Sequence, residues 1–299
     1  MSKSYLFYVV NAFANQPFYG NPAGVFPSAK GLSDEQMQAI AKQLNLVETV
    51  FVLPATEQGI DFQLRYFTPH QELPLAGHPT VATWSALASG GHIDLSNKQV
   101  FQQQTKRGIQ TIELEQIGES VRVLMQQPEP KFLGVVEQRS RVAEIFSLKE
   151  EDLLPGLPVE AIDTGLGHIV FGVNSLDALM RVRRNIAPLK QLCAEYNVAE
   201  AQIYCEETYD AALSLHTRNI CPREGIEDPA CGVGNSALLA YLMKNKVYSE
   251  RTVEINAEQG HVEKMPSTIY VRGSFDNQGK IALAIGGTGV LMVKGEFFV

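Results

Sequence analysis

"PACGVGN", residues 229–235, has a counterpart earlier in the chain, and this match decides the fold. "PLAGHPT", residues 74–80, likewise carries a proline three positions before a glycine. An apolar run with helical periodicity follows each copy, "VATWSALAS" in the first and "SALLAYLMK" in the second. The pattern predicts a strand that ends in a glycine turn and then leads into a helix, and the chain contains this unit twice.

Two further matches precede this one in the same order. "QAIAKQLNLVETVFVL" (38–53) resembles "KQLCAEYNVAEAQIYC" (190–205), and "RYFTP" (65–69) resembles "RNICP" (218–222). A general likeness between strand-turn-helix units would preserve neither the order nor the spacing of three matches, whereas a duplication preserves both. We therefore interpret the chain as two related halves.

Each half is predicted to contain several strands and two helices. The first helix lies near 33–44 or 186–196, and the second opens near 79 or 234. This pattern indicates an α+β fold of two pseudo-symmetric lobes, each a strongly curved, mostly antiparallel sheet, or half-open barrel, around a central helix. The expected lobes are 1–127 and 128–287, and the segment 288–299 is expected to return to the first lobe.

The strand candidates are alternating or fully apolar runs that glycines and polar turns separate. They are "FQLRYFT", "IQTIELEQ", "VRVLMQQ", "AALSLHT", "TVEINA", "TIYVRG" and "KIALAIG".

The composition limits the classes of partner. The chain has 299 residues, 45% of them apolar and 19% charged, and a formal net charge of −8 without a long basic run. Nucleic acid and anionic membranes are therefore poor partners, while a small anionic metabolite remains possible. The four cysteines form no CxxC pair, which favours a reduced, cytoplasmic protein, and we expect a first β-strand near the N-terminus instead of a signal segment.

The two glycine turns are candidates for anion binding. Unpaired N–H groups and the positive end of the helix dipole meet at a helix start, and Gly77 and Gly232 allow a ligand to approach the backbone. His78 and Asp228 flank these turns, one in each half. If the halves face each other, they form a receptor for a carboxylate or a developing enolate; the alternative is two capped helices that bind nothing.

Glu48 is the only charged residue in "NLVETVFVLP", which reads as an interior strand because both faces are apolar. A buried carboxyl group takes up a proton more readily, and a pKa near neutrality suits a general acid and base. The alternative is a glutamate at a cleft rim or in an internal ion pair. Its repeat partner Glu200 is expected to be structural, as is the pair formed by Glu72 and Glu227.

Five motifs together resemble the phenazine-biosynthesis PhzF-like proteins over nearly the whole chain. They are "FYGNPAGV" (18–25), "LVETVFV" (46–52), "RYFTP" (65–69), "LPLAGHPTVA" (73–82) and "EDPACGVGN" (227–235). That family is similar in fold to diaminopimelate epimerase and proline racemase. The resemblance implies a homodimeric, cytoplasmic isomerase that transfers protons without a cofactor or a metal.

The resemblance also implies roles for particular residues. Glu48 falls at the general acid/base position of the family. The positions implied to bind the substrate are Asn21, Gly77, His78, Asp228, Cys231, Gly232 and Val233.

Cys231 and Val233 depart from the family pattern, which usually has a hydroxyl residue before this glycine and often Ser or Asn after it. The repeat partner of Cys231 is Ala76, so a two-thiol racemase is excluded. The more apolar pocket predicts a different substrate. At a helix start the pKa of Cys231 should be lowered, and the thiol either carries a second proton opposite Glu48 or only lines the pocket.

Two other functions remain as alternatives. Cys231 could act as the nucleophile of an acyl-transfer enzyme with His78 as its base, or the cleft could bind a ligand without turnover. A metal hydrolase is poorly supported because the six histidines are scattered without an HExxH pattern. A dinucleotide site at "GGTG" (286–289) is rejected because a strand-like run follows it instead of a helix.

Overall fold

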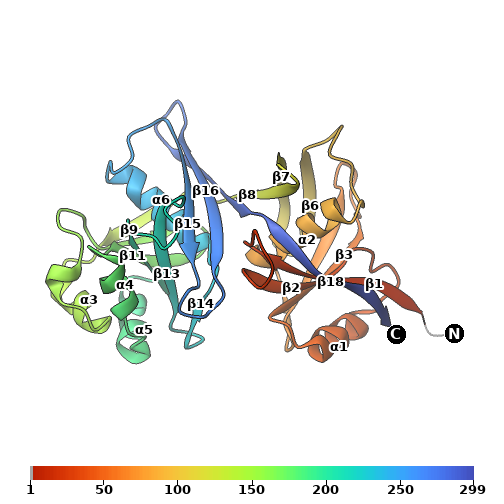
Figure 1. Ribbon diagram of the computed structural model, residues 1–299, viewed down its shortest axis with the longest axis horizontal. Helices are drawn as coiled ribbons and strands as arrows, with labels where there is room; N and C mark the ends of the chain where they lie inside the picture. The colour runs from red at the N-terminus through yellow and green to blue at the C-terminus, as the bar shows by residue number, and fades with distance from the viewer. Residues whose placement is uncertain (1–2) are drawn as a thin grey trace. The chain divides into compact units, whose positions relative to one another are not determined.

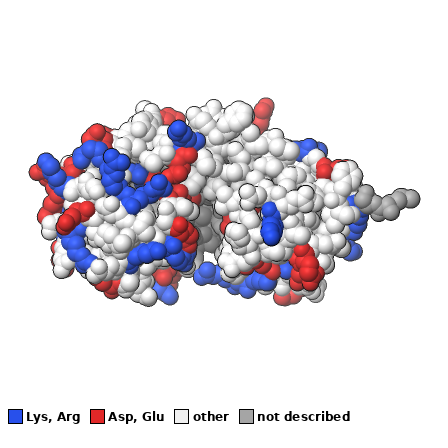
Figure 2. Space-filling view, turned by 90° about the horizontal axis from the view of Figure 1, so that it is seen from below, with Lys and Arg blue, Asp and Glu red and all other residues white. Residues whose placement is uncertain are grey.

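The computed structural model describes residues 3–299, which divide into two compact units (Figure 1). The first unit runs to Gln126 and includes the C-terminal segment Gly286–Val299. The second unit is Gln127–Ile285. Within the described residues, no helix is long and apolar enough to cross a membrane. Basic and acidic side chains are interspersed on the face drawn in Figure 2, as expected from the absence of long charged runs.

The first unit is a curved, mostly antiparallel sheet around one helix. β1 pairs antiparallel with β18 and with β2, β2 pairs parallel with β3, and β3 pairs antiparallel with β4. The elements of this unit are β1 (Ser4–Ala12), β2 (Asn21–Phe26), α1 (Asp34–Leu44), β3 (Glu48–Pro54), β4 (Phe62–Phe67), β5 (Glu72–Leu73), α2 (Gly77–Ser89), β6 (Val100–Thr105), β7 (Gly108–Ile117), β8 (Ser120–Gln126) and β18 (Gly289–Phe298).

The second unit repeats this order of strand pairing. β10 pairs antiparallel with β11, β11 pairs parallel with β12, and β12 pairs antiparallel with β13. Its elements are β9 (Lys131–Val135), α3 (Arg139–Ile145), the 3₁₀ helix η1 (Glu150–Asp152), β10 (Glu160–Asp163), β11 (Gly167–Gly172), α4 (Leu176–Arg181), α5 (Ile186–Glu195), β12 (Glu200–Cys205), β13 (Leu215–Cys221), β14 (Ile226–Asp228), α6 (Gly232–Lys244), β15 (Thr252–Gln259), β16 (Ser267–Phe275) and β17 (Ile281–Gly287).

The predicted helices are confirmed as α1, α2, α5 and α6, and α2 and α6 are the central ones. Every residue from Pro79 to Leu87 is buried, and so is every residue from Gly234 to Met243. A helix that is buried all round needs a sheet curved about it, which these two units supply. The predicted strand "AALSLHT" is wrong at its start, because β13 begins only at Leu215.

A guanidinium–carboxylate pair occurs at the same place in both units. Arg65 of β4 donates to both oxygens of Glu72 at 2.9 and 2.8 Å, and Arg218 of β13 donates to Glu227 at the same two distances. Each pair closes a short antiparallel hairpin, β4–β5 or β13–β14, just before the glycine turn. The prediction that Glu72 and Glu227 are structural agrees with this geometry.

The two pairs differ in burial, and this predicts different costs when the arginine is removed. Arg218→Met would leave the Glu227 carboxylate, 1% exposed, without its counter-charge, at a cost of about 3–5 kcal/mol in the free energy of unfolding. Arg65→Met should cost less, because Glu72 is 13% exposed and also pairs with Lys106. Urea unfolding of both variants tests this, and a larger loss for Arg65→Met would contradict it.

Candidate active site

The predicted residues of the first unit gather at the start of α2. Glu48 is the first residue of β3 and His78 is the second residue of α2, and the Glu48 Oε2 and His78 Nδ1 atoms are 3.3 Å apart. Both side chains are about nine-tenths buried, with 12% and 11% exposed. β3 lies between β2 and β4, as expected for an interior strand.

The imidazole of His78 is neutral at pH 7. Burial lowers its pKa to about 4, against an opposing hydrogen bond with the backbone of Pro22. Pro22 follows Asn21, the first residue of β2, so the third predicted residue of this unit lies next to the same contact. A neutral imidazole beside a carboxylate can donate or accept a hydrogen bond without a change in net charge.

Several polar groups of this unit point to a ligand. Among the described residues, the buried atoms His78 Nε2 and Asn21 Oδ1 have no hydrogen-bond partner. The N-cap residue of α2, Ala76, provides no side-chain cap for the first N–H groups of the helix. A Cβ atom added at Gly77 would meet no atom within 4 Å, so space is open beside this helix start. Unpartnered buried polar atoms are costly unless a ligand completes them.

In the second unit the equivalent helix start is occupied by protein groups. Cys231 is the N-cap of α6, and its Sγ atom accepts from Gly234 N at 3.3 Å. The thiol also lies 3.8 Å from His168 Nε2 and 3.9 Å from Glu200 Oε2. His168 and Glu200 are neighbours on the parallel strands β11 and β12 and are joined by a contact of 3.1 Å.

The protons of this cluster follow from its contacts. His168 Nδ1 lies 2.9 Å from the carbonyl oxygen of Leu166, which only accepts, so Nδ1 carries a proton. Burial raises the pKa of Glu200, but hydrogen bonds from His168 and other neighbours together leave the pKa lowered. Glu200 is therefore a carboxylate, held by its contact with the buried His168. This contact supports a structural role for Glu200.

The expectation of a lowered pKa for Cys231 is wrong. Burial raises the pKa of the thiol well above its ordinary value, and the carboxylates of Glu200 and Asp228 raise it further. The hydrogen bond from Gly234 opposes this increase but does not reverse it. Position at a helix start lowers a thiol pKa only where the thiolate is not also desolvated beside negative charges.

The remaining predicted residues surround this thiol. Asp228 ends β14, and burial raises its pKa to about 6, although its carboxylate accepts from Ala230 N at 2.8 Å. Gly232 and Val233 form the first turn of α6, where Val233 O accepts from Thr164 Oγ1 at 3.2 Å. The structure thus groups the eight predicted residues into two sets, one in each unit.

His168 is the site residue that the sequence interpretation missed. It pairs with Glu200 in the parallel register, just as Ala23 pairs with Glu48 in the first unit. An alignment of β2 with β11 would place His168 at the position equivalent to Ala23. Because one residue is a histidine and the other an alanine, residue similarity alone gives no signal for this alignment.

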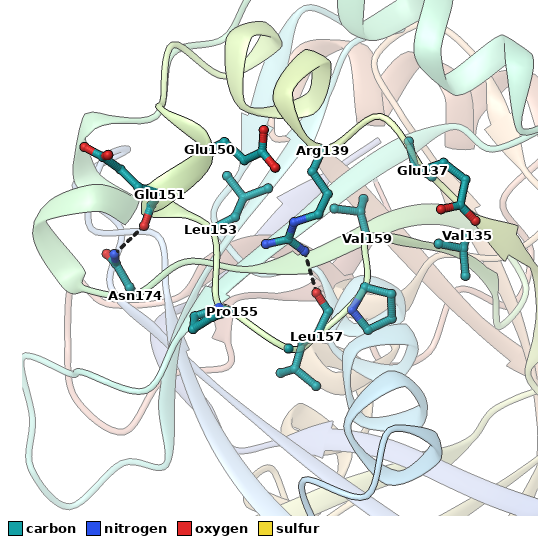
Figure 3. A pocket seen from close by; sticks show the side chains of 13 residues that line it. Val135, Glu137, Arg139, Glu150, Glu151, Leu153, Pro155, Leu157, Val159 and Asn174 are labelled. Atoms are coloured by element: carbon teal, nitrogen blue, oxygen red, sulfur yellow. Dashed lines mark hydrogen bonds between the residues drawn. The ribbon is translucent and has the colours of Figure 1, made fainter.

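A surface pocket lies elsewhere in the second unit (Figure 3). It has a volume of about 760 Å3 and is lined by residues of β9, α3, η1 and the following loop. The guanidinium of Arg139 points toward this loop and donates to the carbonyl oxygens of Leu157 and Leu154 at 2.5 and 2.9 Å. None of the predicted site residues is part of its described lining.

Comparison with known proteins assigns the family. The model of the phenazine biosynthesis-like proteins matches residues 10–295, so the chain belongs to this family. It is 31% identical to the trans-2,3-dihydro-3-hydroxyanthranilate isomerase of Pseudomonas aeruginosa, with 97% of this chain and 98% of that protein covered. The crystal structure of a phenazine biosynthesis protein of the PhzF family from Bacillus anthracis matches with a TM-score of 0.87 at 30% identity, with 99% of this chain and 100% of that chain covered.

The comparisons also confirm the fold class. A probable proline racemase from Agrobacterium radiobacter superposes with a TM-score of 0.62 at 15% identity, covering 97% of this chain and 92% of that chain. At this identity the likeness concerns the fold alone. The predicted membership in an isomerase family is confirmed, while the roles of the individual residues stay predictions.

The raised pKa of Asp228 predicts a pH-dependent loss of stability. Because the folded-state pKa of about 6 exceeds the ordinary value of 3.8, the protonated form favours folding. This contribution is complete below the ordinary pKa and is lost as the pH rises through 6. Relative to Asp228→Asn, the wild type should lose about 2 kcal/mol between pH 4 and pH 7, since one pKa unit corresponds to about 1.4 kcal/mol and residual exposure screens part of it.

Thermal or urea unfolding of both proteins across this pH range measures the difference. The other groups that titrate in this pH range contribute equally to the stability of both proteins, so the comparison cancels their contribution. Asparagine also keeps the oxygen atom that accepts from Ala230 N. A difference that does not change with pH would contradict the raised pKa.

Proposed function

We propose that this protein is an isomerase that moves a proton on a small carboxylic acid, with Glu48 as the general acid and base. The observation that carries the proposal is the contact of 3.3 Å between Glu48 and the buried His78 at the start of α2. A carboxylate that transfers this proton must lie next to the reacting carbon atom, and the site must also hold the substrate in that position. The first unit brings a carboxylate and a helix start together in space, at Glu48 and the first turn of α2.

The roles follow from the charges. Glu48 takes a proton from a carbon atom activated by the substrate's carboxylate and returns it to another carbon atom. His78, neutral at pH 7, donates or accepts a hydrogen bond with the substrate through Nε2. The N–H groups of the first turn of α2 stabilise negative charge on the substrate, because the helix dipole is positive there.

The second unit contributes binding groups in this proposal. Asp228, Cys231, Gly232 and Val233 lie at the start of α6, where Asp228 can hydrogen-bond a substrate amine or hydroxyl. The raised pKa of Cys231 disfavours a nucleophilic thiolate and hence acyl transfer. The location of the substrate between the two lobes stays a prediction of the repeat and of the family resemblance.

The substrate class is suggested by a relative whose name gives a substrate. Trans-2,3-dihydro-3-hydroxyanthranilate combines a carboxylate, an amine and a hydroxyl group on a cyclohexadiene ring. The apolar Val233 and the thiol of Cys231 favour a related but different acid here. Small amino, hydroxy and cyclohexadienyl carboxylic acids are therefore the compounds to screen.

Glu48→Gln tests the proton transfer. Incubation with the panel of acids in deuterated water, read by mass, should show carbon-bound deuterium with the wild type and an exchange rate about 10²–10⁴-fold lower with the variant, since glutamine cannot carry the proton. Ligand affinity, measured by calorimetry with the same acid, should change little. The exposed Glu57→Gln is the matched control and should exchange at the wild-type rate.

Deuterium uptake that survives Glu48→Gln would refute the role of this residue. Binding without exchange in the wild type, across all the acids that bind, would instead support the non-catalytic alternative.

Gly77→Ala tests the open space at the start of α2. The added methyl group meets no protein atom within 4 Å, so the melting temperature should stay unchanged while affinity for the carboxylate falls at least several-fold. Gly234→Ala is the contrasting variant, because its methyl group would lie 2.3 Å from Gln202 Oε1 and should lower the melting temperature. Unchanged affinity in Gly77→Ala would show that the ligand does not approach this helix start.

A further inference from the structure

A second group of titratable side chains lies in the second unit, outside the proposed active site. It comprises His216 at the start of β13, Glu258 near the end of β15 and His261 just after β15. The parallel register of β13 and β15 places His216 beside Glu258. One ligand atom from each of the three residues lies within 4.8 Å of the others.

Glu258 fixes the tautomer of His216. Its Oε1 atom lies 2.6 Å from His216 Nδ1, and its two oxygens also accept from the backbone N–H groups of Tyr209 and Asp210 at 2.6 and 3.2 Å. A carboxylate accepts, so Nδ1 of His216 carries a proton and Nε2 is left to act as a metal ligand.

Both imidazoles present a buried nitrogen without a protein partner. Among the described residues, His216 Nε2 and His261 Nδ1 have no hydrogen-bond partner, and the His216 side chain is 0% exposed. The ring centroids of the two histidines are 4.9 Å apart.

Tyr209 covers the two rings on the solvent side. Its ring centroid lies 4.7 Å from that of His261 and 5.4 Å from that of His216, while 57% of the residue is exposed. The same residue donates its backbone N–H to Glu258. Glu258 therefore orients His216, while Tyr209 packs against both imidazole rings.

We propose that His216 and His261 bind a divalent transition-metal ion such as Zn²⁺, with Glu258 orienting His216 from the far side of its ring. Imidazole nitrogens suit Zn²⁺, Ni²⁺ and Cu²⁺, and a metal-bound histidine commonly donates its other N–H to a carboxylate. Water completes the coordination sphere on the Tyr209 side. The ion satisfies both nitrogens, which otherwise stay desolvated without a partner.

The cluster at Cys231 is the weaker candidate for this ion. His168, Glu200 and Cys231 also lie within ligand distance of one another. However, His168 and Glu200 already contact each other at 3.1 Å, and the thiol would have to lose a proton whose removal burial makes costly. No nitrogen of His168 lacks a partner there, because its Nδ1 and Nε2 both make contacts.

Metal titration of the full-length protein tests the proposal. After dialysis against a chelator, calorimetry with Zn²⁺ should show one ion per chain in the wild type and no such binding in His261→Gln or His216→Asn. Glu258→Gln should weaken binding about 10–100-fold, the usual effect of removing the group that orients a metal-bound histidine. The exposed His70→Gln is the matched control and should bind as the wild type does.

A second measurement locates the ion and guards against misfolding. Cys231→Ser should keep full binding, and the Co²⁺-loaded wild type should lack a sulfur-to-cobalt charge-transfer band. Circular dichroism reports whether the variants fold, and the partly exposed His261 provides the variant least prone to unfolding. The absence of stoichiometric binding in the wild type, its retention in folded His261→Gln, or its loss in Cys231→Ser would each overturn the proposal.

Discussion

The bidentate pairing of an arginine with a glutamate is the constraint on which both units depend. Arg65 with Glu72 and Arg218 with Glu227 close the hairpin that delivers the chain to a glycine turn. The turn must be held there because the helix that follows is buried on all sides and its start carries unpaired N–H groups. A charge pair satisfied by two parallel hydrogen bonds fixes direction as well as distance, which an apolar contact would not.

The duplicated scaffold carries different chemistry in its two copies. In the first unit, a neutral His78 stands beside Glu48, and polar atoms at the uncapped helix start point to a ligand. In the second unit, Cys231 caps the helix, and the hydrogen-bonded pair of His168 and Glu200 lies against the thiol. The same backbone positions therefore carry unpartnered polar atoms in one copy and internally paired groups in the other. This asymmetry favours one acid/base group over a pair of equivalent thiols.

Burial decides the character of the titratable groups more than their position along a helix does. Cys231 lies at a helix start, yet burial keeps its thiol protonated; at His78, burial and the positive end of the helix dipole both favour the neutral imidazole. Asp228, close to Glu200, has its pKa raised to about 6 by the same cause. An argument from the helix dipole predicts the direction of a pKa shift correctly only when the side chain stays solvated. For a buried group, the desolvation of the charge outweighs the field of the first helical turn.

The sequence by itself determined the duplication, the central helices and the family. These features rest on periodicity and on the order of local motifs, which neighbouring residues specify. Only the tertiary structure placed His168 against Glu200 and His216 against Glu258, because each pair joins parallel strands that are distant along the chain. It alone also reversed the expected ionisation of Cys231, since desolvation depends on everything packed around an atom and not on the residues beside it in sequence.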